Sequence, residues 1–127
     1  MKVLFTGGGT AGHINPALAA AGYLLQKEPD AQILYVGNKG GMEERLVPQA
    51  GFEIQTVHIS GFQRKLTPKN LVRNAQTVVR VFTASAEAKR ILTAFGPDVC
   101  VGTGGYVSGP VIREAATLGI PCVIHES

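Results

Sequence analysis

The strongest constraint on the fold is the regular alternation of short apolar runs with longer helical patterns along the chain. The apolar runs predict strands at 2–6, 32–36, 53–59, 99–101 and 121–124. Helical patterns lie between them at 14–26, 42–50, 68–95 and 110–118. Short, continuously apolar strands are typical of a parallel sheet covered by helices on both faces. Right-handed crossovers then predict an α/β, Rossmann-like, doubly wound parallel sheet in the strand order 3-2-1-4-5.

Length and composition fit one domain of this kind. The chain has 127 residues, of which 45% are apolar and 17% charged, so it can bury a core and is not disordered. No apolar run approaches the roughly 18 residues that cross a bilayer, and the N-terminal run is too short for a signal peptide. Cys100 and Cys122 lie in apolar runs, so we expect buried thiols in a reducing compartment.

The last predicted strand stops at the segment 125–127, where a carboxyl end should lead into a functional loop. We therefore expect one domain over 1–127 that is truncated or belongs to a split protein.

Charge is distributed unevenly along the sequence. From Ser60 to Arg90, seven basic residues stand against one acid, whereas the remainder holds five basic and eight acidic residues. A segment of charge +6 beside a body of charge −3 indicates an anionic partner: phosphate, nucleic acid or membrane. Aromatic residues make up only 6% and offer few stacking platforms, so nucleic acid is not favoured.

The basic segment contains a candidate membrane patch on the predicted helix 68–95. Its apolar members at helical spacing are Leu71, Val72, Val78, Val79 and Phe82, and its basic members are Lys69, Arg73 and Arg80. Apolar insertion combined with Lys/Arg attraction to anionic lipid is typical of interfacial helices. The alternative is that the apolar stripe is simply the face that packs against the sheet.

A glycine-rich loop, Gly7–His13, lies between the first predicted strand and its helix. Free backbone N–H groups and the helix dipole favour an anion there, and glycines allow its close approach. The alternative is a tight turn that binds nothing. Gly7, Gly9 and Gly12 also match a dinucleotide fingerprint, but no acid ends the second strand. Lys39 could serve a 2′-phosphate, so an NADP-binding domain remains an alternative.

A second glycine loop, Gly102–Pro110, follows the fourth predicted strand, next to the first strand in the expected order. Two such loops at one crevice suit a sugar-linked diphosphate, and the Thr, Tyr and Ser hydroxyls would add neutral donors. A nicotinamide cofactor gives no reason for this loop.

Candidate catalytic groups are few. His13 is either a general base or orienting donor beside the phosphates, or a residue that caps the helix. His125 and Glu126 end the last predicted strand, where they line a site or are simply solvated. No His, Cys, Asp or Glu cluster has metal-ligand spacing, and Ser108 does not lie in a nucleophile elbow, so we expect neither a metal or cofactor nor covalent nucleophilic catalysis.

Seven short motifs together resemble one family. In chain order they are Gly8–His13, Met42–Glu43, Leu46–Pro48, Ile59–Gly61, Gly104–Pro110, Gly119–Pro121 and His125–Glu126. As a set they resemble the N-terminal domain of the MurG family, bacterial N-acetylglucosaminyltransferases of peptidoglycan synthesis, over essentially the whole chain. The resemblance implies one Rossmann-like half of a GT-B glycosyltransferase. That enzyme transfers GlcNAc from UDP-GlcNAc to undecaprenyl-diphosphate-linked muramoyl-pentapeptide (lipid I) with inversion, giving lipid II for the cell wall, cell shape and division.

The resemblance also implies roles for individual residues. This half would take the acceptor and rest peripherally on the cytoplasmic face of the cell membrane, with the patch around Val78, Val79 and Phe82 against the lipid. The residues implied to cradle the acceptor diphosphate are Gly8, Gly9, Gly104, Gly105, Tyr106 and Ser108. Those implied to lie against the donor are Thr10, Ala11 and Gly12. His13 would be the base or orienter for the attacking hydroxyl, and Glu126 would line the cleft.

Two departures from the family pattern affect these expectations. Ala11 stands where the family often has glycine, and the chain stops one residue before a commonly present Asn that helps to hold the donor. The C-terminal donor-binding domain is also absent, so we expect this chain alone to be inactive. An alternative is a non-catalytic, membrane-recruiting acceptor half of a split lipid-linked GlcNAc transferase, as in the eukaryotic dolichol pathway.

Overall fold

The computed structural model describes residues 1–59 and 68–125, and for 68–74 and 76–81 it describes the backbone alone. The strands are β1 (Lys2–Thr6), β2 (Gln32–Asn38), β3 (Glu53–Val57), β4 (Val99–Gly102) and β5 (Cys122–Ile124). The helices are α1 (Ala11–Lys27), α2 (Glu43–Gln49), α3 (Pro68–Phe95) and α4 (Ser108–Thr117). The strands form one parallel sheet in the order β3-β2-β1-β4-β5, which confirms the predicted topology.

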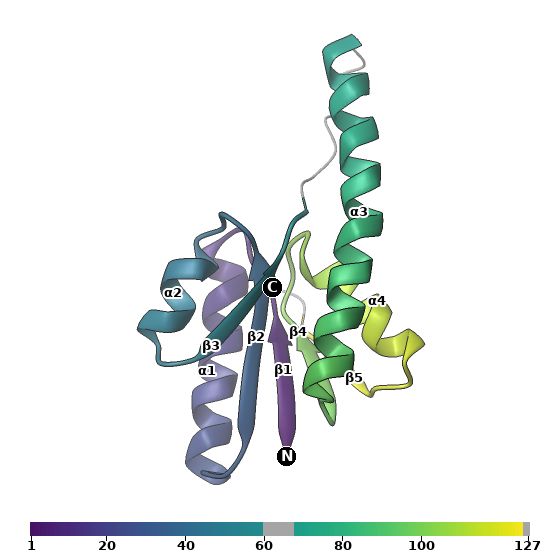
Figure 1. Cartoon of the computed structure of the whole chain (residues 1–127). Coiled ribbons are helices and arrows are strands. Elements are labelled where there is room, and N and C mark those ends of the chain that lie inside the picture. The colour runs from purple at the N-terminus through teal and green to yellow at the C-terminus, as the bar shows by residue number, and fades with distance from the viewer. Residues whose placement is uncertain (60–67, 126–127) are drawn as a thin grey trace.

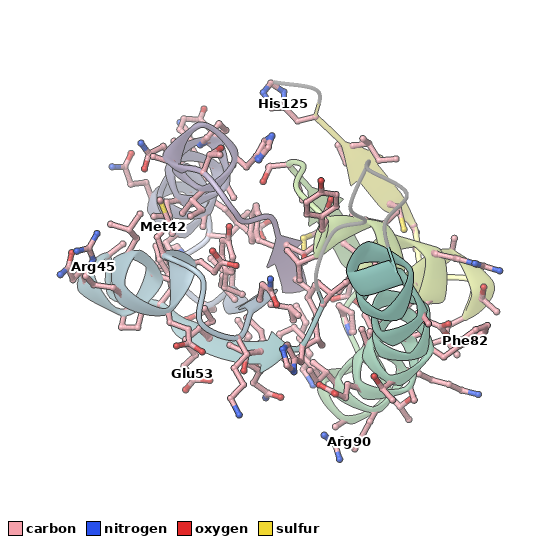
Figure 2. The ribbon with its side chains drawn as sticks, turned by 90° about the horizontal axis from the view of Figure 1, so that it is seen from above. Met42, Arg45, Glu53, Phe82, Arg90 and His125 are labelled. Atoms are coloured by element: carbon pink, nitrogen blue, oxygen red, sulfur yellow. The ribbon has the colours of Figure 1, made fainter. Side chains whose placement is uncertain are left out.

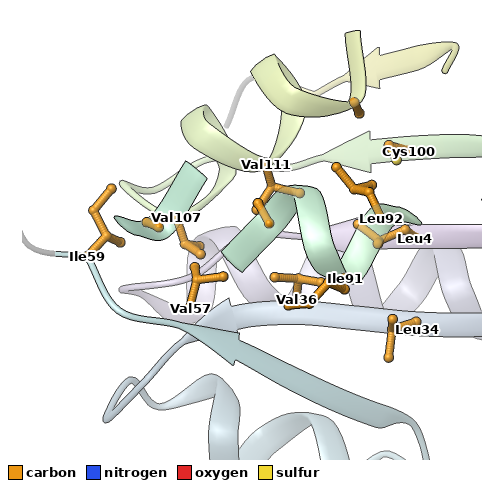
Figure 3. Close-up of a cluster of buried hydrophobic side chains, with 13 residues drawn as sticks. Leu4, Leu34, Val36, Val57, Ile59, Ile91, Leu92, Cys100, Val107 and Val111 are labelled. Carbon is orange, nitrogen blue, oxygen red and sulfur yellow. The ribbon is translucent and has the colours of Figure 1, made fainter. Parts of the chain in front are cut away.

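Helices cover both faces of the sheet, α1 and α2 on one side and α3 and α4 on the other (Figure 1). Each face has its own apolar cluster. One joins Leu4, Val36 and Cys100 of the strands to Leu92 of α3 and Val111 of α4 (Figure 3). The other joins alternate strand residues such as Val3 and Phe5 to Ile14, Ala17 and Val47 on α1 and α2. This two-faced burial explains why the central strands are continuously apolar.

Two helices begin earlier than the sequence predicts. α1 begins at Ala11 instead of 14, and α4 begins at Ser108 instead of 110. In both cases glycine, a poor helix former, stands within the first turn and hides the helical period in the sequence. The early start of α1 places His13 inside its first turn and not in the preceding loop.

β3 is shorter than the predicted strand and ends at Val57. Past this point the Asn38 side chain takes over the pairing: its Nδ2 donates to the Ile59 carbonyl at 2.8 Å, and its Oδ1 accepts from the Ile59 N–H at 3.0 Å. An amide side chain thus holds the chain where the backbone ladder stops.

α3 matches the predicted range, but its two halves have different surroundings. The residues that pack on the sheet, Ala84, Ala88, Ile91 and Leu92, all lie in its C-terminal half. The N-terminal half projects beyond the carboxyl edge of the sheet (Figure 1). Most of the predicted membrane patch therefore lies on a stretch of helix with no sheet beneath it.

The two cysteines differ in exposure. Cys100 is buried, as predicted, whereas Cys122, its neighbour across the β4–β5 pair, is only half-buried. β5 is an edge strand in which Val123 and Ile124 are exposed, so less of the protein covers a side chain there than at the central strands. Among the described residues no helix is long and apolar enough to span a bilayer.

Candidate functional site

The two glycine loops meet at the carboxyl ends of β1 and β4, the central point of the sheet where the strand order reverses. The Gly8 N–H donates to the Gly104 carbonyl at 3.2 Å. Thr103 strengthens the junction, because its hydroxyl donates to the His13 carbonyl at 2.6 Å and its N–H to the Thr6 carbonyl at 3.0 Å. The loops are therefore one hydrogen-bonded unit, and they lie next to each other as the strand order 3-2-1-4-5 predicted.

Close packing accounts for several of the glycines without a ligand. A Cβ on Gly105 would collide with the Gly8 carbonyl oxygen, and one on Gly8 would collide with the Glu43 carboxylate. Gly9 differs, because its φ is 87° and nothing lies within 4 Å of its Cβ position. Gly9 is thus the position in the first loop where the backbone itself, through a left-handed conformation, requires glycine.

His13 lies half-buried in the first turn of α1 with its ring against both loops. Its Nδ1 is 3.0 Å from the Gly8 carbonyl oxygen and 3.2 Å from the Thr10 hydroxyl. A carbonyl oxygen can only accept, so the Gly8 contact places the proton on Nδ1 in the neutral ring. Nε2, the other nitrogen, is then the one that can accept a proton.

Glu43 is a site residue whose role sequence reasoning missed. Its side chain is fully buried, with Oε1 accepting the Asn38 N–H at 2.6 Å and Oε2 the Gly9 N–H at 3.4 Å. In the sequence it stands only within the Met42–Glu43 motif, and a glutamate at the start of a short helix is ordinarily exposed. The available signal was the neighbouring glycines, since Cβ atoms on Gly37 and Gly41 would occupy the space of its side chain.

Tyr35 supports the same loop from within the sheet. Its hydroxyl is buried and donates to the Gly7 carbonyl at 2.8 Å. Burial, and secondarily the negative charge of Glu43, hold the pKa of Tyr35 far above its usual value. The phenol therefore stays protonated and remains a donor to the loop at any physiological pH.

A cavity of about 600 Å³ opens beside the loop junction. Its lining residues are Gly8, Gly9, Thr10, His13, Gly105 and Tyr106. All six are predicted site residues, and they come from two segments more than 90 positions apart in the sequence. Tyr106 is 69% exposed, so its ring lies over open space and has room to contact a ligand.

Other predicted site residues lie elsewhere. Ala11 and Gly12 are exposed in the first turn of α1 and do not line this cavity. Gly104 and Ser108 line a neighbouring cavity of about 330 Å³ together with Arg113 and His125. The Ser108 hydroxyl donates to the Gly105 carbonyl at 3.2 Å and so stabilises its own loop.

Two predictions concern parts of the chain that the structure does not describe. Glu126 lies outside the described residues. The same holds for the side chains of most of the membrane patch: Lys69, Leu71, Val72, Arg73, Val78, Val79 and Arg80. Phe82 is the member of the membrane patch whose side chain is described; it is 73% exposed and points outward from α3 (Figure 2). His125, another predicted site residue, lies at the end of β5 (Figure 2).

The local electrostatics favour an anion. Within the described part of the chain, neither the α1 nor the α4 N-terminus has a side-chain cap or an acidic residue in its first turn. Both termini lie at the glycine loops, where the positive ends of the helix dipoles attract negative charge. No group of His, Cys, Asp or Glu side chains suited to a metal ion occurs in 1–59 or 68–125.

Comparison with known proteins identifies the family. The model described as the Glycosyltransferase family 28 N-terminal domain matches residues 3–127. The chain belongs to this family. The fold agrees: a crystal structure of MurG from Acinetobacter baumannii, 33% identical, superimposes with a TM-score of 0.80 over 98% of this chain and 34% of that one. A GT-B glycosyltransferase N-terminal domain is therefore the fold class, as predicted.

Relatives of this chain are identical to it at about half of the 126 aligned residues. Two of them carry the name UDP-N-acetylglucosamine–N-acetylmuramyl-(pentapeptide) pyrophosphoryl-undecaprenol N-acetylglucosamine transferase. The protein from Lactococcus lactis subsp. cremoris strain MG1363 is 50% identical over 126 residues, and that from Thermoanaerobacter sp. strain X514 is 52% identical over 126 residues. Each match covers 99% of this chain and 34% of the relative. The chain thus spans about a third of the length of these relatives.

Family 28 membership bears on the alternatives. It supports the expectation of a glycosyltransferase half over that of an NADP-binding domain. The relatives described above are named for an undecaprenol-linked muramyl-(pentapeptide) acceptor and not for a dolichol-linked one, so the split dolichol-type half is not favoured either.

Proposed function

We propose that this chain is the acceptor-binding, N-terminal part of an inverting transferase that moves GlcNAc from UDP-GlcNAc to undecaprenyl-diphosphate-linked muramoyl-pentapeptide. The observation that carries the proposal is the cavity at the loop junction, where His13 stands beside two uncapped helix N-termini. The names of the relatives that share half of its residues supply the substrates.

The chemistry assigned to this half is a single displacement. The acceptor hydroxyl oxygen attacks C1 of GlcNAc, the bond from C1 to the UDP oxygen breaks, and UDP leaves with the electron pair. His13 Nε2 takes the hydroxyl proton, for which its Nδ1–H contact with Gly8 is the right tautomer. One base is sufficient for inversion, so the lack of a candidate nucleophile is consistent with this route.

The acceptor diphosphate would lie against the loops. Gly8, Gly9, Gly105 and Tyr106 line the cavity, and Gly104 and Ser108 lie next to it. The N-termini of α1 and α4 would stabilise the two negative phosphates, a site type for which backbone N–H groups are well suited. Thr10, Ala11 and Gly12 stand at the exposed start of α1, where a donor held by a second domain would come into contact.

We assign the projecting half of α3 to the membrane surface. It extends past the carboxyl edge of the sheet (Figure 1) and carries the patch residues from Lys69 to Arg80. Phe82, which follows it directly along the helix, is exposed. A lipid-linked acceptor requires its enzyme to work at a bilayer. The location would be peripheral, on the cytoplasmic face, where UDP-sugars are made.

A chimera tests the assignment of His13. This chain would replace the matching N-terminal third of the Lactococcus lactis relative, and transfer of labelled GlcNAc to the lipid-linked acceptor would be measured. His13→Asn should lower kcat by between about a hundredfold and ten-thousandfold, the usual contribution of a general base. His58→Asn is the matched control, because His58 is exposed beyond β3 and lines none of the cavities described above.

The assignment would be wrong if a folded His13→Asn chimera kept wild-type kcat. It would also be wrong if His58→Asn caused an equal loss.

A further inference from the structure

A single peptide group connects the buried carboxylate of Glu43 to the ring of His13. The peptide between Gly8 and Gly9 presents its carbonyl oxygen to His13 Nδ1 at 3.0 Å and its N–H to Glu43 Oε2 at 3.4 Å. The C=O and N–H of a trans peptide point in opposite directions. Glu43 therefore holds this peptide from the protein interior while His13 holds it from the cavity side.

The carboxylate is itself fixed in place. Its exposure is 0%, and its other oxygen accepts the Asn38 N–H at 2.6 Å. Side chains on Gly8, Gly37 or Gly41 would overlap it, so the surrounding backbone forms a close-fitting enclosure. Because the carboxylate cannot move, its contact with the Gly9 N–H fixes the orientation of the Gly8–Gly9 peptide.

We propose that Glu43 is a positioning residue that fixes the tautomer of His13 through the Gly8–Gly9 peptide. Accepting the Gly9 N–H polarises the peptide, which makes the Gly8 carbonyl a stronger acceptor for His13 Nδ1–H. The proton is held on Nδ1, and Nε2 is left to receive the proton of the acceptor hydroxyl. The catalytic part of this inference rests on the proposed function, whereas the tautomer does not.

The number of acceptor atoms explains why the position needs a carboxylate. Two backbone N–H groups point at the side chain, and glutamate offers an oxygen to each. Glutamine offers only one oxygen, which the shorter Asn38 bond retains. Its NH₂ group then faces the Gly9 N–H, donor against donor, and the peptide loses its interior partner.

Nitrogen NMR of this chain tests the tautomer directly. Long-range ¹⁵N–¹H spectra at about pH 8.5, two units above the ordinary histidine pKa, distinguish Nδ1–H from Nε2–H rings. The three histidines would be assigned by single substitutions of His58 and His125. The variants are Glu43→Gln, the exposed neighbour Glu44→Gln as matched control, and Tyr35→Phe, which removes the hydroxyl contact to Gly7 without touching the Gly8–Gly9 peptide.

The expected result is an Nδ1–H ring at His13 in the wild type, in Glu44→Gln and in Tyr35→Phe, with a shift towards Nε2–H in Glu43→Gln. An Nε2–H ring in the wild type, or an unchanged Nδ1–H ring in folded Glu43→Gln, would overturn the proposal. If Glu43→Gln does not fold, Glu43→Asp takes its place: a shift of the His13 ring towards Nε2–H would support the proposal, and an unchanged Nδ1–H ring would overturn it. Its carboxylate is one methylene shorter and cannot reach both Asn38 and Gly9.

The chimera supplies the kinetic test. Glu43→Gln should lower kcat by up to about a hundredfold, the effect of a misplaced catalytic group, and leave KM for UDP-GlcNAc within about twofold. Glu44→Gln should keep wild-type kcat. The positioning role of Glu43 would be overturned if the two variants lost kcat equally, or if Glu43→Gln kept wild-type kcat. A folded wild-type chimera without transfer would overturn the proposed function, while the NMR result would still decide the tautomer.

Discussion

At the loop junction, backbone conformation and close packing leave little room for a side chain at the glycine positions. Gly105 has a φ of 88° and a Cβ position that overlaps the Gly8 carbonyl oxygen, whereas Gly22 lies within α1 with nothing within 4 Å of its Cβ position. Left-handed backbone and steric overlap both penalise a side chain at Gly105. At Gly22 an added methyl group only improves helix propensity.

We therefore expect opposite effects of alanine at these two positions. Gly105→Ala should reduce the free energy of unfolding by about 3 kcal/mol or more, because strain and overlap add. Gly22→Ala should raise it by about 0.5–1 kcal/mol. Urea unfolding followed by circular dichroism measures both, and equal stability of the two variants would contradict the described packing.

The buried thiol predicts a pH dependence of stability. Burial, with a smaller contribution from neighbouring Cys122, raises the pKa of Cys100 from 9.0 to about 12. Between these values the folded state holds a proton that the unfolded state has lost, so stability is full below about pH 9 and falls as pH rises towards 12. The slope for one group is at most about 1.4 kcal/mol per pH unit.

Comparison of the wild type with Cys100→Ala isolates this contribution. Urea unfolding under reducing conditions at pH 8, 9 and 10 should show the wild type losing stability more steeply than the variant. Parallel decreases in the two proteins would mean that ionisation of the Cys100 thiol is not suppressed by folding.

At the scale of elements, apolar periodicity was sufficient to predict the bounds of a helix where that helix packs on the sheet or ends at a glycine. It placed α3 at Pro68–Phe95 and located all five strands, whose order then followed from the right-handed crossover rule. It was insufficient at the starts of α1 and α4, where glycines within the first turn replace the apolar period. It also gave no role to Glu43, because burial of a carboxylate depends on contacts between distant loops that periodicity does not encode.

The projecting half of α3 carries a prediction of its own. If Lys69, Arg73 and Arg80 face anionic lipid, replacing all three with Gln should weaken binding to phosphatidylglycerol-containing vesicles by roughly 3 kcal/mol, or about two orders of magnitude. A matched variant with Gln at Lys27, Arg45 and Arg90, which are exposed outside the projecting half of α3 and line neither cavity, should bind nearly as well as the wild type. Vesicle sedimentation measures both, and equal weakening would indicate nonspecific charge attraction in place of a defined surface.

At the scale of the whole molecule, the proposed function makes the site at the loop junction one side of a two-domain active site. The chain spans about a third of the length of its family 28 relatives and contains the candidate base, the loops for an anion and the exposed start of α1. The sequence motifs contained all six residues that line the cavity, because both glycine-rich segments begin at strand ends on the same edge of the sheet. The roles of these residues remain predictions. The donor contacts need a second domain, so they remain predictions.

The most direct test of the central claim is GlcNAc transfer by three purified proteins: this chain alone, the C-terminal two-thirds of the Lactococcus lactis relative alone, and the chimera of the two. Each would receive labelled UDP-GlcNAc and the lipid-linked muramoyl-pentapeptide acceptor. We predict product with the chimera and none with either part, because the proposed function assigns the base and the donor site to different domains. Transfer by this chain alone, or no transfer by a folded chimera, would contradict the account.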